Sequence, residues 1–475
     1  MKYEDYAAQD AVGLAGLIAR REVSAAEALE AALTRMAEVN PKLNAVTLEL
    51  ADRARAEVRA GVPAGPLAGV PFLLKDLGPT LAGTATTSAS RLYADDIAET
   101  DSPLTALYKA AGLVIFGKTN TPELGLEPVT EPVMFGPSRN PWDLDRTPGG
   151  SSGGASAAVA GGIVPAAHAS DGGGSIRTPA STCGLFGLKP SKGRVSYAPK
   201  NEGWGGFSMM HAITRSVRDS AVLLDIAAHP QAGDPYWLDP PATPFAEEVG
   251  RDPGRLRIAF TTAAFGADAL DPECVEAVKD AAKLCESLGH QVEEVGLPGD
   301  YPAAAAAAGL VIAASTAADL DAVAERRGRP IAEDEVEPVT WGSYQRGRRI
   351  DGSSYVRALK IAHAYGRTMA GFLGRYDIQL SSTLGSPAIP IGHLRGAGMD
   401  QREYARRLFA FMPNTQIYNI TGQPAMTVPL AWSAGGLPIG LQFAARVAED
   451  ALLFRLAGQL ERARPWKDRR PTGLG

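Results

Sequence analysis

Two glycine-rich segments, each carrying a serine, contain the residue types most suited to chemistry. Residues 147–155 include Ser151, and residues 172–175 read Gly-Gly-Gly-Ser and end at Ser175. A stretch of small apolar residues, 157–164, lies between them. A serine hydroxyl becomes a nucleophile when a neighbouring base takes its proton, and glycine lets the backbone approach a ligand closely. Gly/Ser tracts often are flexible linkers, but two serine-bearing glycine clusters on either side of a tightly packed helix suggest that the backbone approaches another group closely.

The first segment also matches the nucleophile elbow of α/β-hydrolases, because residues 149–153 satisfy G-x-S-x-G. That motif requires a strand directly before it. Residues 140–148 instead form a proline-punctuated loop. None of the six histidines has a distinctive setting, but their spacing does not exclude one as a partner. An α/β-hydrolase esterase using Ser151 or Ser152 therefore stays open as an alternative.

A third pattern, at residues 112–119, fits the P-loop expression G-x-x-x-x-G-K-[ST]. A P-loop needs its middle residues in a tight turn around phosphate. Here they read Leu-Val-Ile-Phe, which is a strand sequence. The match does not predict nucleotide binding.

Composition excludes several other classes of protein. The 475 residues are 45% hydrophobic, carry a net charge of −6 and contain no long basic block, so nucleic-acid binding is not expected. Residues 1–6 are charged, and no apolar run approaches the roughly 18 residues that span a bilayer, so we expect no membrane partner and a cytoplasmic location. Three scattered cysteines and no paired histidines predict neither disulfides nor a metal site, and no cofactor is expected.

The elements that must position the serines alternate between helix and strand. Residues 11–18 and a run from the capping box at Ser24 to Val39 form part of a helical lead-in of about 1–60. Residues 69–76 predict a buried strand that places Lys75 near its end. Further predicted helices are 103–111, 272–288, 301–318 and 354–376, and further predicted strands are 113–116, 257–260, 291–295 and 378–380. The alternation indicates an α/β fold, and the proline-rich residues 234–254 are an excursion within it.

Three blocks carry a resemblance to a known family. Residues 149–154 (Gly-Gly-Ser-Ser-Gly-Gly), 170–177 (Ser-Asp-Gly-Gly-Gly-Ser-Ile-Arg) and 183–190 (Cys-Gly-Leu-Phe-Gly-Leu-Lys-Pro) follow one another as in the amidase signature family. Residues 69–76, 117–125 and 419–425 are similar to further blocks of that family. The resemblance covers most of the chain, and it looks closest to bacterial amidases grouped with nylon-oligomer (6-aminohexanoate cyclic dimer) hydrolases.

The resemblance implies a fold and a domain organisation. The expected fold is α/β, with a large mixed twisted β-sheet covered by helices on both faces. Residues 1–475 would form a single domain with a signature core at about 69–200.

The resemblance also implies a Ser-Ser-Lys triad. Ser175 would be the nucleophile, Ser151 a bridging serine with a cis peptide bond, and Lys75 the base, with 175 − 151 = 24 positions between the serines. Lysine acts as a base only when neutral, and the apolar run 70–74 supplies burial that lowers its pKa. Asp76 would oppose this, so we expect it to face away from Lys75.

Other residues receive supporting roles. The N–H groups of Gly172, Gly173, Gly174 and Ser175 are expected to form an oxyanion hole. Ser152, Asp171 and Arg177 are expected to support these loops, with Asp171 and Arg177 as an ion pair. Met134 and Phe135 are candidates for the substrate pocket, and Lys118 and Lys189 are interpreted as structural charges.

The expected function is hydrolysis of a carboxylic amide C–N bond through an acyl-enzyme. The partners would be water and a small linear or cyclic amide, anilide or carbamate, and the protein would be a monomer or homodimer. Two alternatives stay open. A GatA-like subunit of a tRNA-dependent amidotransferase would act in a complex, and an α/β-hydrolase esterase would need an essential histidine.

Overall fold

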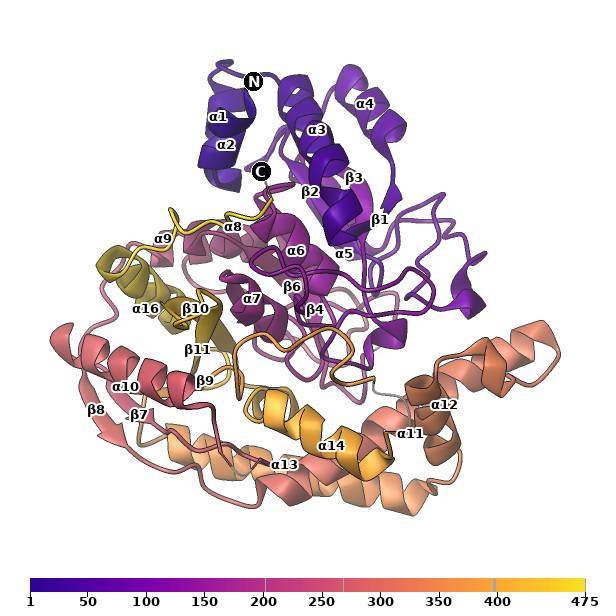
Figure 1. Ribbon diagram of the computed structural model, residues 1–475, viewed down its shortest axis with the longest axis vertical. Coiled ribbons are helices and arrows are strands. Elements are labelled where there is room, and N and C mark those ends of the chain that lie inside the picture. Colours follow the sequence, from indigo (N-terminus) through magenta and orange to yellow (C-terminus); the bar gives the residue numbers. More distant parts are fainter. Residues whose placement is uncertain (201, 268, 396–398, 475) are drawn as a thin grey trace.

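The computed structural model describes residues 1–200, 202–267, 269–395 and 399–474. Its centre is an 11-stranded sheet with the order β1-β3-β2-β4-β6-β5-β10-β11-β9-β7-β8 (Figure 1). The sheet is mixed, because β2 runs parallel to β3 and β4 whereas β4, β6, β5, β10, β11 and β9 pair antiparallel in turn. The predicted α/β class with a mixed sheet is confirmed.

The strands and helices have the following bounds, given in chain order. The strands are β1 Val46–Glu49, β2 Pro71–Lys75, β3 Val114–Thr119, β4 Ala166–Asp171, β5 Phe186–Lys189, β6 Met209–Thr214, β7 Arg257–Phe260, β8 Gln291–Glu294, β9 Ile378–Ser382, β10 Ala425–Trp432 and β11 Pro438–Ala444. The helices are α1 Tyr3–Ala8, α2 Ala11–Ala19, α3 Ala25–Leu43, α4 Ala51–Ala60, α5 Pro103–Ala110, α6 Gly153–Ala160, α7 Arg177–Cys183, α8 Val217–Ala227, α9 Phe245–Glu248, α10 Pro272–Ser287, α11 Tyr301–Arg327, α12 Pro338–Gly347, α13 Gly352–Leu373, α14 Gln401–Phe411, α15 Ile417–Thr421 and α16 Asp450–Ala463.

The N-terminal lead-in is helical, but it contributes one strand to the sheet. The capping box opens α3 as predicted, because Ser24 Oγ accepts from Glu27 N and the Glu27 carboxylate accepts from Ser24 N. Strand β1 then interrupts the helices and pairs antiparallel with β3. Only four residues long, it gives too weak an alternation of apolar and polar positions to stand out in the sequence.

Helices cover both faces of the C-terminal half of the sheet. Neighbouring residues of a strand point to opposite faces, and here they join different cores. Ile258 and Met426 pack with α8, α10 and α16, whereas Ala259 and Ala425 pack with α11, α13 and α15. The parallel pair of β7 and β8 with α10 between them confirms the β-α-β unit predicted from the sequence.

Helix α11 extends nine residues beyond the predicted end at residue 318. Its length and apolar composition would suffice to cross a membrane, but half of its most apolar window is buried inside the protein, as in a core helix. It packs along α12 and α13 (Figure 1). Arg326 and Arg327 in its last turn suit the negative end of the helix dipole, and Gly328 ends it in the left-handed conformation.

Strands β2 and β4 are parallel neighbours, paired at Leu73 and Ala167. Their carboxyl ends therefore lie at the same edge of the sheet, where Lys75 ends β2 and Asp171 ends β4. Two short helices start beside this edge. The turn before α6 carries Ser151, and the turn before α7 carries Ser175. The fold thus brings three residues that are far apart in sequence to one place.

Candidate active site

Lys75 and Ser151 are in direct contact. Lys75 Nζ lies 2.7 Å from Ser151 Oγ and 3.1 Å from Ser170 Oγ, and the lysine is fully buried. The peptide bond between Gly150 and Ser151 is cis, as the resemblance implied. Ser170 was quoted in the sequence only as part of a motif, and its contact with Lys75 was not predicted.

Burial sets the protonation of this lysine. It lowers the pKa of Lys75 to about 7, against an opposing effect of the Asp171 charge. The carboxylate of Asp76 turns away, as expected, and accepts hydrogen bonds from the N–H and the hydroxyl of Thr87. Burial raises the pKa of Asp76 to about 6, while Thr87 and Lys118 act in the opposite sense. Lys75 can therefore lose its proton near neutral pH.

A buried histidine lies beside the same strand end. The backbone N–H of Lys75 approaches His168 Nδ1 at 3.4 Å, and the rings of His168 and Tyr108 form a T-shaped pair. Burial and the Lys75 charge lower the pKa of His168 to about 3, so the imidazole is neutral. It contacts the backbone of Lys75 and makes no hydrogen bond with a described serine, which is not the arrangement of a serine–histidine pair.

Ser175 lies in the turn between β4 and α7 and is half-buried. Its carbonyl accepts from Ser152 N at 3.3 Å, which joins the two serine-bearing turns. Ser152 Oγ lies 3.2 Å from the carbonyl oxygen of Ser170 and so ties its own turn to β4. The Ser175 hydroxyl forms no hydrogen bond with any described residue, so of the three predicted triad residues only Lys75 and Ser151 are in direct contact.

The loop that bears Ser175 is anchored by a buried ion pair. Arg177 and Asp171 are both fully buried, and Arg177 Nη2 lies 2.9 Å from Asp171 Oδ1. Burial alone would raise the pKa of Asp171, but Arg177 outweighs it and holds the value at about 2. Asn419 from α15 donates to Asp171 Oδ1 and accepts from Arg177 Nη2. The predicted ion pair is confirmed, and Asn419 is a support that the sequence did not reveal.

Not all four amides of residues 172–175 are free to bind an oxyanion. The expectation is wrong for Gly174, whose N–H donates to Asp171 Oδ1 at 2.7 Å. The N–H groups of Gly173 and Ser175 donate to no described residue, which leaves them available. Thr415 Oγ1 donates to the Gly173 carbonyl at 2.6 Å and fixes the orientation of that peptide.

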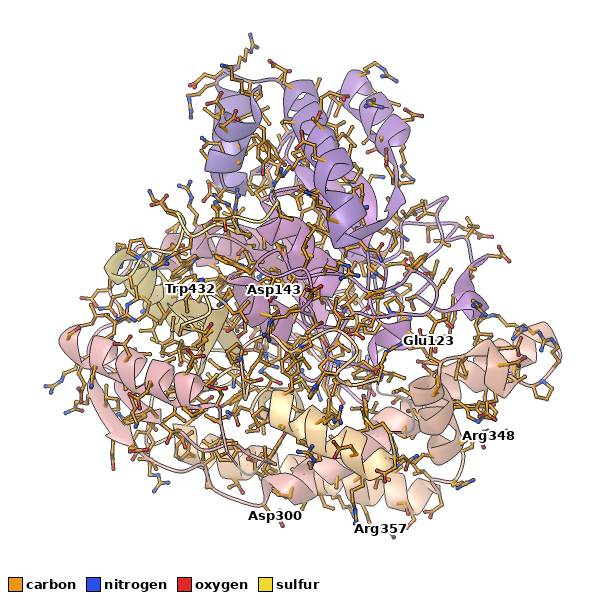
Figure 2. All side chains as sticks on the ribbon, viewed as in Figure 1. Glu123, Asp143, Asp300, Arg348, Arg357 and Trp432 are labelled. Atoms are coloured by element: carbon orange, nitrogen blue, oxygen red, sulfur yellow. The ribbon has the colours of Figure 1, made fainter. Side chains whose placement is uncertain are left out.

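A short segment from residue 123 to residue 125 lies beside Ser151. A Cβ added to Gly125 would lie 3.2 Å from Ser151 Oγ, and the φ of Gly125 is +69°. Glu123 accepts from Ser90 Oγ and from the N–H of Glu337, so it holds this segment against the start of α12. Figure 2 labels Glu123 at this junction between the N-terminal part of the chain and the α11–α12 pair.

Four other sequence candidates lie apart from these contacts. Met134 and Phe135 are half-buried in a turn, where the Phe135 carbonyl accepts from Asn44 Nδ2, and their role in a pocket stays a prediction. Lys118 and Lys189 are buried and donate to backbone carbonyls, those of Ala85 and Pro190. Burial lowers the pKa of Lys118 to about 8 and that of Lys189 to about 7, and their interpretation as structural charges stays a prediction.

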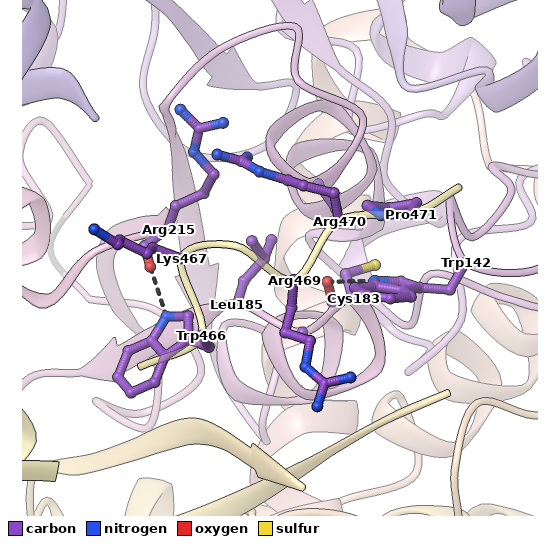
Figure 3. A pocket seen from close by; sticks show the side chains of 11 residues that line it. Trp142, Cys183, Leu185, Arg215, Trp466, Lys467, Arg469, Arg470 and Pro471 are labelled. Atoms are coloured by element: carbon purple, nitrogen blue, oxygen red, sulfur yellow. Dashed lines mark hydrogen bonds between the residues drawn. The ribbon is translucent and has the colours of Figure 1, made fainter. Parts of the chain in front are cut away.

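A separate pocket lies at the far ends of α6 and α7, beside Ala160 and Cys183 (Figure 3). It is walled by two tryptophans and by cations: Trp142, Trp466, Arg215, Lys467, Arg469 and Arg470. Trp466 Nε1 donates to the carbonyl of Arg215, and Trp142 Nε1 donates to that of Cys183. None of the triad residues lines it.

The structure thus brings together a sheet edge that ends in a buried lysine, two serine-bearing turns, and the backbone amides of Gly173 and Ser175, which donate to no described residue. The amidase family model matches residues 27–454, and the chain belongs to that family. Relatives are named amidases, acylamidases and cyclic-dimer hydrolases, and this chain is an amidohydrolase that acts on C–N bonds other than peptide bonds. The P-loop and α/β-hydrolase interpretations are not supported, because residues 114–119 form a strand and no strand precedes Ser151.

Individual relatives are similar in sequence along nearly the whole chain. A 6-aminohexanoate-cyclic-dimer hydrolase from Paenarthrobacter ureafaciens is 37% identical over 487 residues, covering 98% of this chain and 97% of the relative. An acylamidase from Rhodococcus erythropolis is 34% identical, covering 97% of each chain. The solved structure of a 6-aminohexanoate cyclic dimer hydrolase complexed with substrate superposes with a TM-score of 0.93 at 35% identity, covering 99% of this chain and 100% of that one. The resemblance to this group is confirmed.

Proposed function

We propose that the chain hydrolyses carboxylic amides through a covalent acyl-enzyme on Ser175, with Lys75 as the base and Ser151 as the relay. The observation that carries the proposal is the 2.7 Å contact between Lys75 Nζ and Ser151 Oγ, in which a fully buried lysine at the end of β2 meets the turn that is hydrogen-bonded to Ser175. A charged ammonium could not accept a proton. Burial supplies the neutral amine that the reaction needs.

The steps follow from these positions. Ser175 Oγ attacks the amide carbonyl, its proton passes to Ser151 Oγ, and the Ser151 proton passes to Lys75 Nζ. The carbonyl oxygen becomes an oxyanion that the N–H groups of Gly173 and Ser175 stabilise, with Gly172 as a further candidate donor. The proton then returns through Ser151 to the leaving nitrogen, and the C–N bond breaks. Water attacks the resulting ester by the same relay and releases the carboxylic acid.

The substrate class is proposed from the relatives. One is named for a cyclic dimer of 6-aminohexanoate and another for acyl amides. We therefore propose a small linear or cyclic amide or an anilide as substrate, and carbamates and esters are worth testing for the same acyl transfer. The catalytic chemistry proposed here requires only the chain, substrate and water. A monomer or homodimer and a cytoplasmic location remain predictions.

A serine-directed probe tests the proposal. A fluorophosphonate should label Ser175, and Ser175→Ala should abolish both labelling and amide turnover. Ser287→Ala is the matched control, because Ser287 ends α10 on the surface. Undiminished turnover in Ser175→Ala would overturn the proposal. Activity of the purified chain without glutamine or a partner protein is expected, and a strict requirement for both would favour the amidotransferase-subunit alternative.

A further inference from the structure

The indole of Trp204 lies directly on the backbone of the loop that carries Ser175. A Cβ built on Gly172 would come within 2.5 Å of Trp204 Cζ3 and 2.6 Å of Trp204 Cε3. Carbon atoms that are not bonded to each other essentially never approach that closely. Any residue other than glycine at 172 would therefore displace the ring. Trp204 is half-buried, which leaves part of its surface exposed beside the loop.

The backbone that presents this tryptophan is held in an unusual conformation. Trp204 has a φ of +52°, and Gly205 and Gly206 follow at +62° and +78°. A positive φ is uncommon for a bulky residue and recurs where a side chain is held for ligand binding. The turn packs closely against α11, because a Cβ on Gly205 would lie 2.7 Å from Val311 Cγ1. The ring is therefore positioned by the fold and not by chance surface packing.

The next residue along the loop faces different side chains. A Cβ on Gly173 would lie 3.9 Å from Met412 Cε and 3.9 Å from both Cγ and Nε2 of Gln416. These are ordinary contact distances, and Gly173, Met412 and Gln416 are all half-buried. Like Trp204, both side chains are uncharged. Two charged residues that flank the loop, Asp171 and Arg177, are fully buried and paired with each other, and Lys192 Nζ lies beside the Trp204 turn, 2.5 Å from where a Cβ on Gly206 would be.

We propose that Trp204, with Met412 and Gln416, selects the acyl part of the substrate, and that the site takes amides whose carbonyl bears an uncharged, mainly methylene chain. This inference rests on the proposed function, because the proposed function places the scissile carbonyl at Ser175 and Gly173. The indole and the thioether offer apolar surface to the chain, and the Gln416 amide offers one neutral polar group. A carboxylate or ammonium close to the carbonyl would lose water, and the charges of Asp171 and Arg177 are already paired with each other.

The consequence is a dependence on chain length. Each methylene that leaves water for an apolar wall contributes a factor of about four in affinity or in kcat/KM when burial is complete. We expect kcat/KM to rise two- to fourfold per methylene from acetyl to butyryl to hexanoyl p-nitroanilide. Succinyl p-nitroanilide, which carries a carboxylate, should react at least tenfold more slowly than the butyryl compound.

Removing the indole tests the assignment. In Trp204→Ala the increase from acetyl to hexanoyl should fall to less than half of the wild-type ratio, whereas Trp204→Phe should keep most of it. Trp237→Ala is the matched control, because Trp237 is 63% exposed and lies outside the loop contacts described above. It should leave the ratio unchanged. A residue that only supports the fold would lower all three rates together and leave the ratio intact.

Labelling rates separate this inference from the proposed function. Alkyl fluorophosphonates of increasing chain length should label Ser175 with the same length dependence as the anilides, and Trp204→Ala should flatten it. If Ser175→Ala kept its activity, the proposed function would fail. If Ser175 is essential but the length dependence is absent in the wild type, or equal in Trp204→Ala and the wild type, the role of Trp204 is refuted.

Gly172→Ala offers a second test that does not depend on truncating the tryptophan. The added methyl group should push the indole away and reduce the turnover of both the acetyl and the hexanoyl compound, the latter at least tenfold. The double variant Gly172→Ala/Trp204→Ala has no ring to clash with and should recover acetyl turnover relative to Gly172→Ala alone. Additive losses in the double variant would contradict the contact as the cause.

Discussion

The two ends of α6 and α7 handle positive charge in opposite ways. At the N-terminal ends lie Ser151 and Ser175, and the nearest unpaired lysine, Lys75, is fully buried and has its pKa lowered to about 7. At the C-terminal ends lie four cations, Arg215, Lys467, Arg469 and Arg470, none of which forms an ion pair with a described carboxylate. Both arrangements suit the polarity of a helix, whose N-terminus favours negative charge and whose C-terminus favours positive charge.

The difference lies in how each end accommodates buried charge. Near the serines, Asp171 and Arg177 form a fully buried pair of opposite charges, and burial lowers the pKa of Lys75 to about 7. In the cation-lined pocket, Arg215 and Arg470 donate to the backbone carbonyls of Gln9 and Ala7. The first end holds a buried lysine whose pKa is lowered, and the second holds the C-terminal segment against α1 through Arg470.

Removing one lysine from each end should give the largest contrast. Lys75→Ala should lower kcat/KM for an anilide by about 10²- to 10⁴-fold, because it removes the base. Lys467→Ala should leave it unchanged, because Lys467 is exposed at the far end. Steady-state kinetics on both variants, with circular dichroism to confirm folding, checks this. Equal losses would show that charge in general, and not the proton on Lys75, matters.

Replacing one buried aspartate by asparagine at each end should lower the free energy of unfolding by different amounts. Asp171→Asn breaks the ion pair with Arg177 and the contact with Gly174 N, so it should cost about 3–5 kcal/mol. Burial and the Asp10 charge already raise the pKa of Asp219, near Arg215, to about 7, so Asp219→Asn should cost less than about 2 kcal/mol.

Urea unfolding of both variants measures the difference. The folded pKa of Asp171 is about 2, below the value of about 3.9 for an unfolded aspartate. Its contribution is therefore complete above about pH 4 and is lost as the pH falls toward 2. A cost for Asp219→Asn that equals that of Asp171→Asn would remove the distinction between the two ends.

The pH dependence of turnover tests the proton switch itself. Because only neutral Lys75 can accept a proton, kcat/KM should rise about tenfold per pH unit below pH 7 and level off above about pH 8. A stopped assay with one buffer series from pH 5 to pH 9 measures it. An unchanged rate from pH 5 to pH 9 would mean that no group with a pKa near 7 acts as the base.

Local signals explain why so much of the site was visible in the sequence. Lys75 follows an apolar run, and Ser151 and Ser175 lie in glycine clusters, so composition marked each of them. The fold class followed from alternating strands and helices. Their assignment to a triad, however, came from resemblance to a family, because spacing alone also fitted a linker or an elbow.

The site residues that could not be predicted from the sequence share one property: they act through tertiary contacts. Asn419 reaches Asp171 across 248 positions, and Trp204 meets Gly172 from a loop with no motif of its own. The commitment of Gly174 N to Asp171 depends on the shape of one turn. Periodicity and composition describe local chain, so they carry no information on which distant side chain completes a site.

Arg470 at the far end should show the smallest effect. Burial and the neighbouring charge of Arg215 lower the pKa of Arg470 to about 10, so the two guanidinium groups destabilise each other. Arg470→Gln removes that repulsion together with the hydrogen bond to the Ala7 carbonyl, and the two changes should nearly cancel, within about 1 kcal/mol. Salt screens the repulsion only in the wild type, so its melting temperature should rise more with added salt than that of the variant. A loss above about 3 kcal/mol in Arg470→Gln, with no change in salt dependence, would mean that this end also pairs its charges, as the catalytic end does.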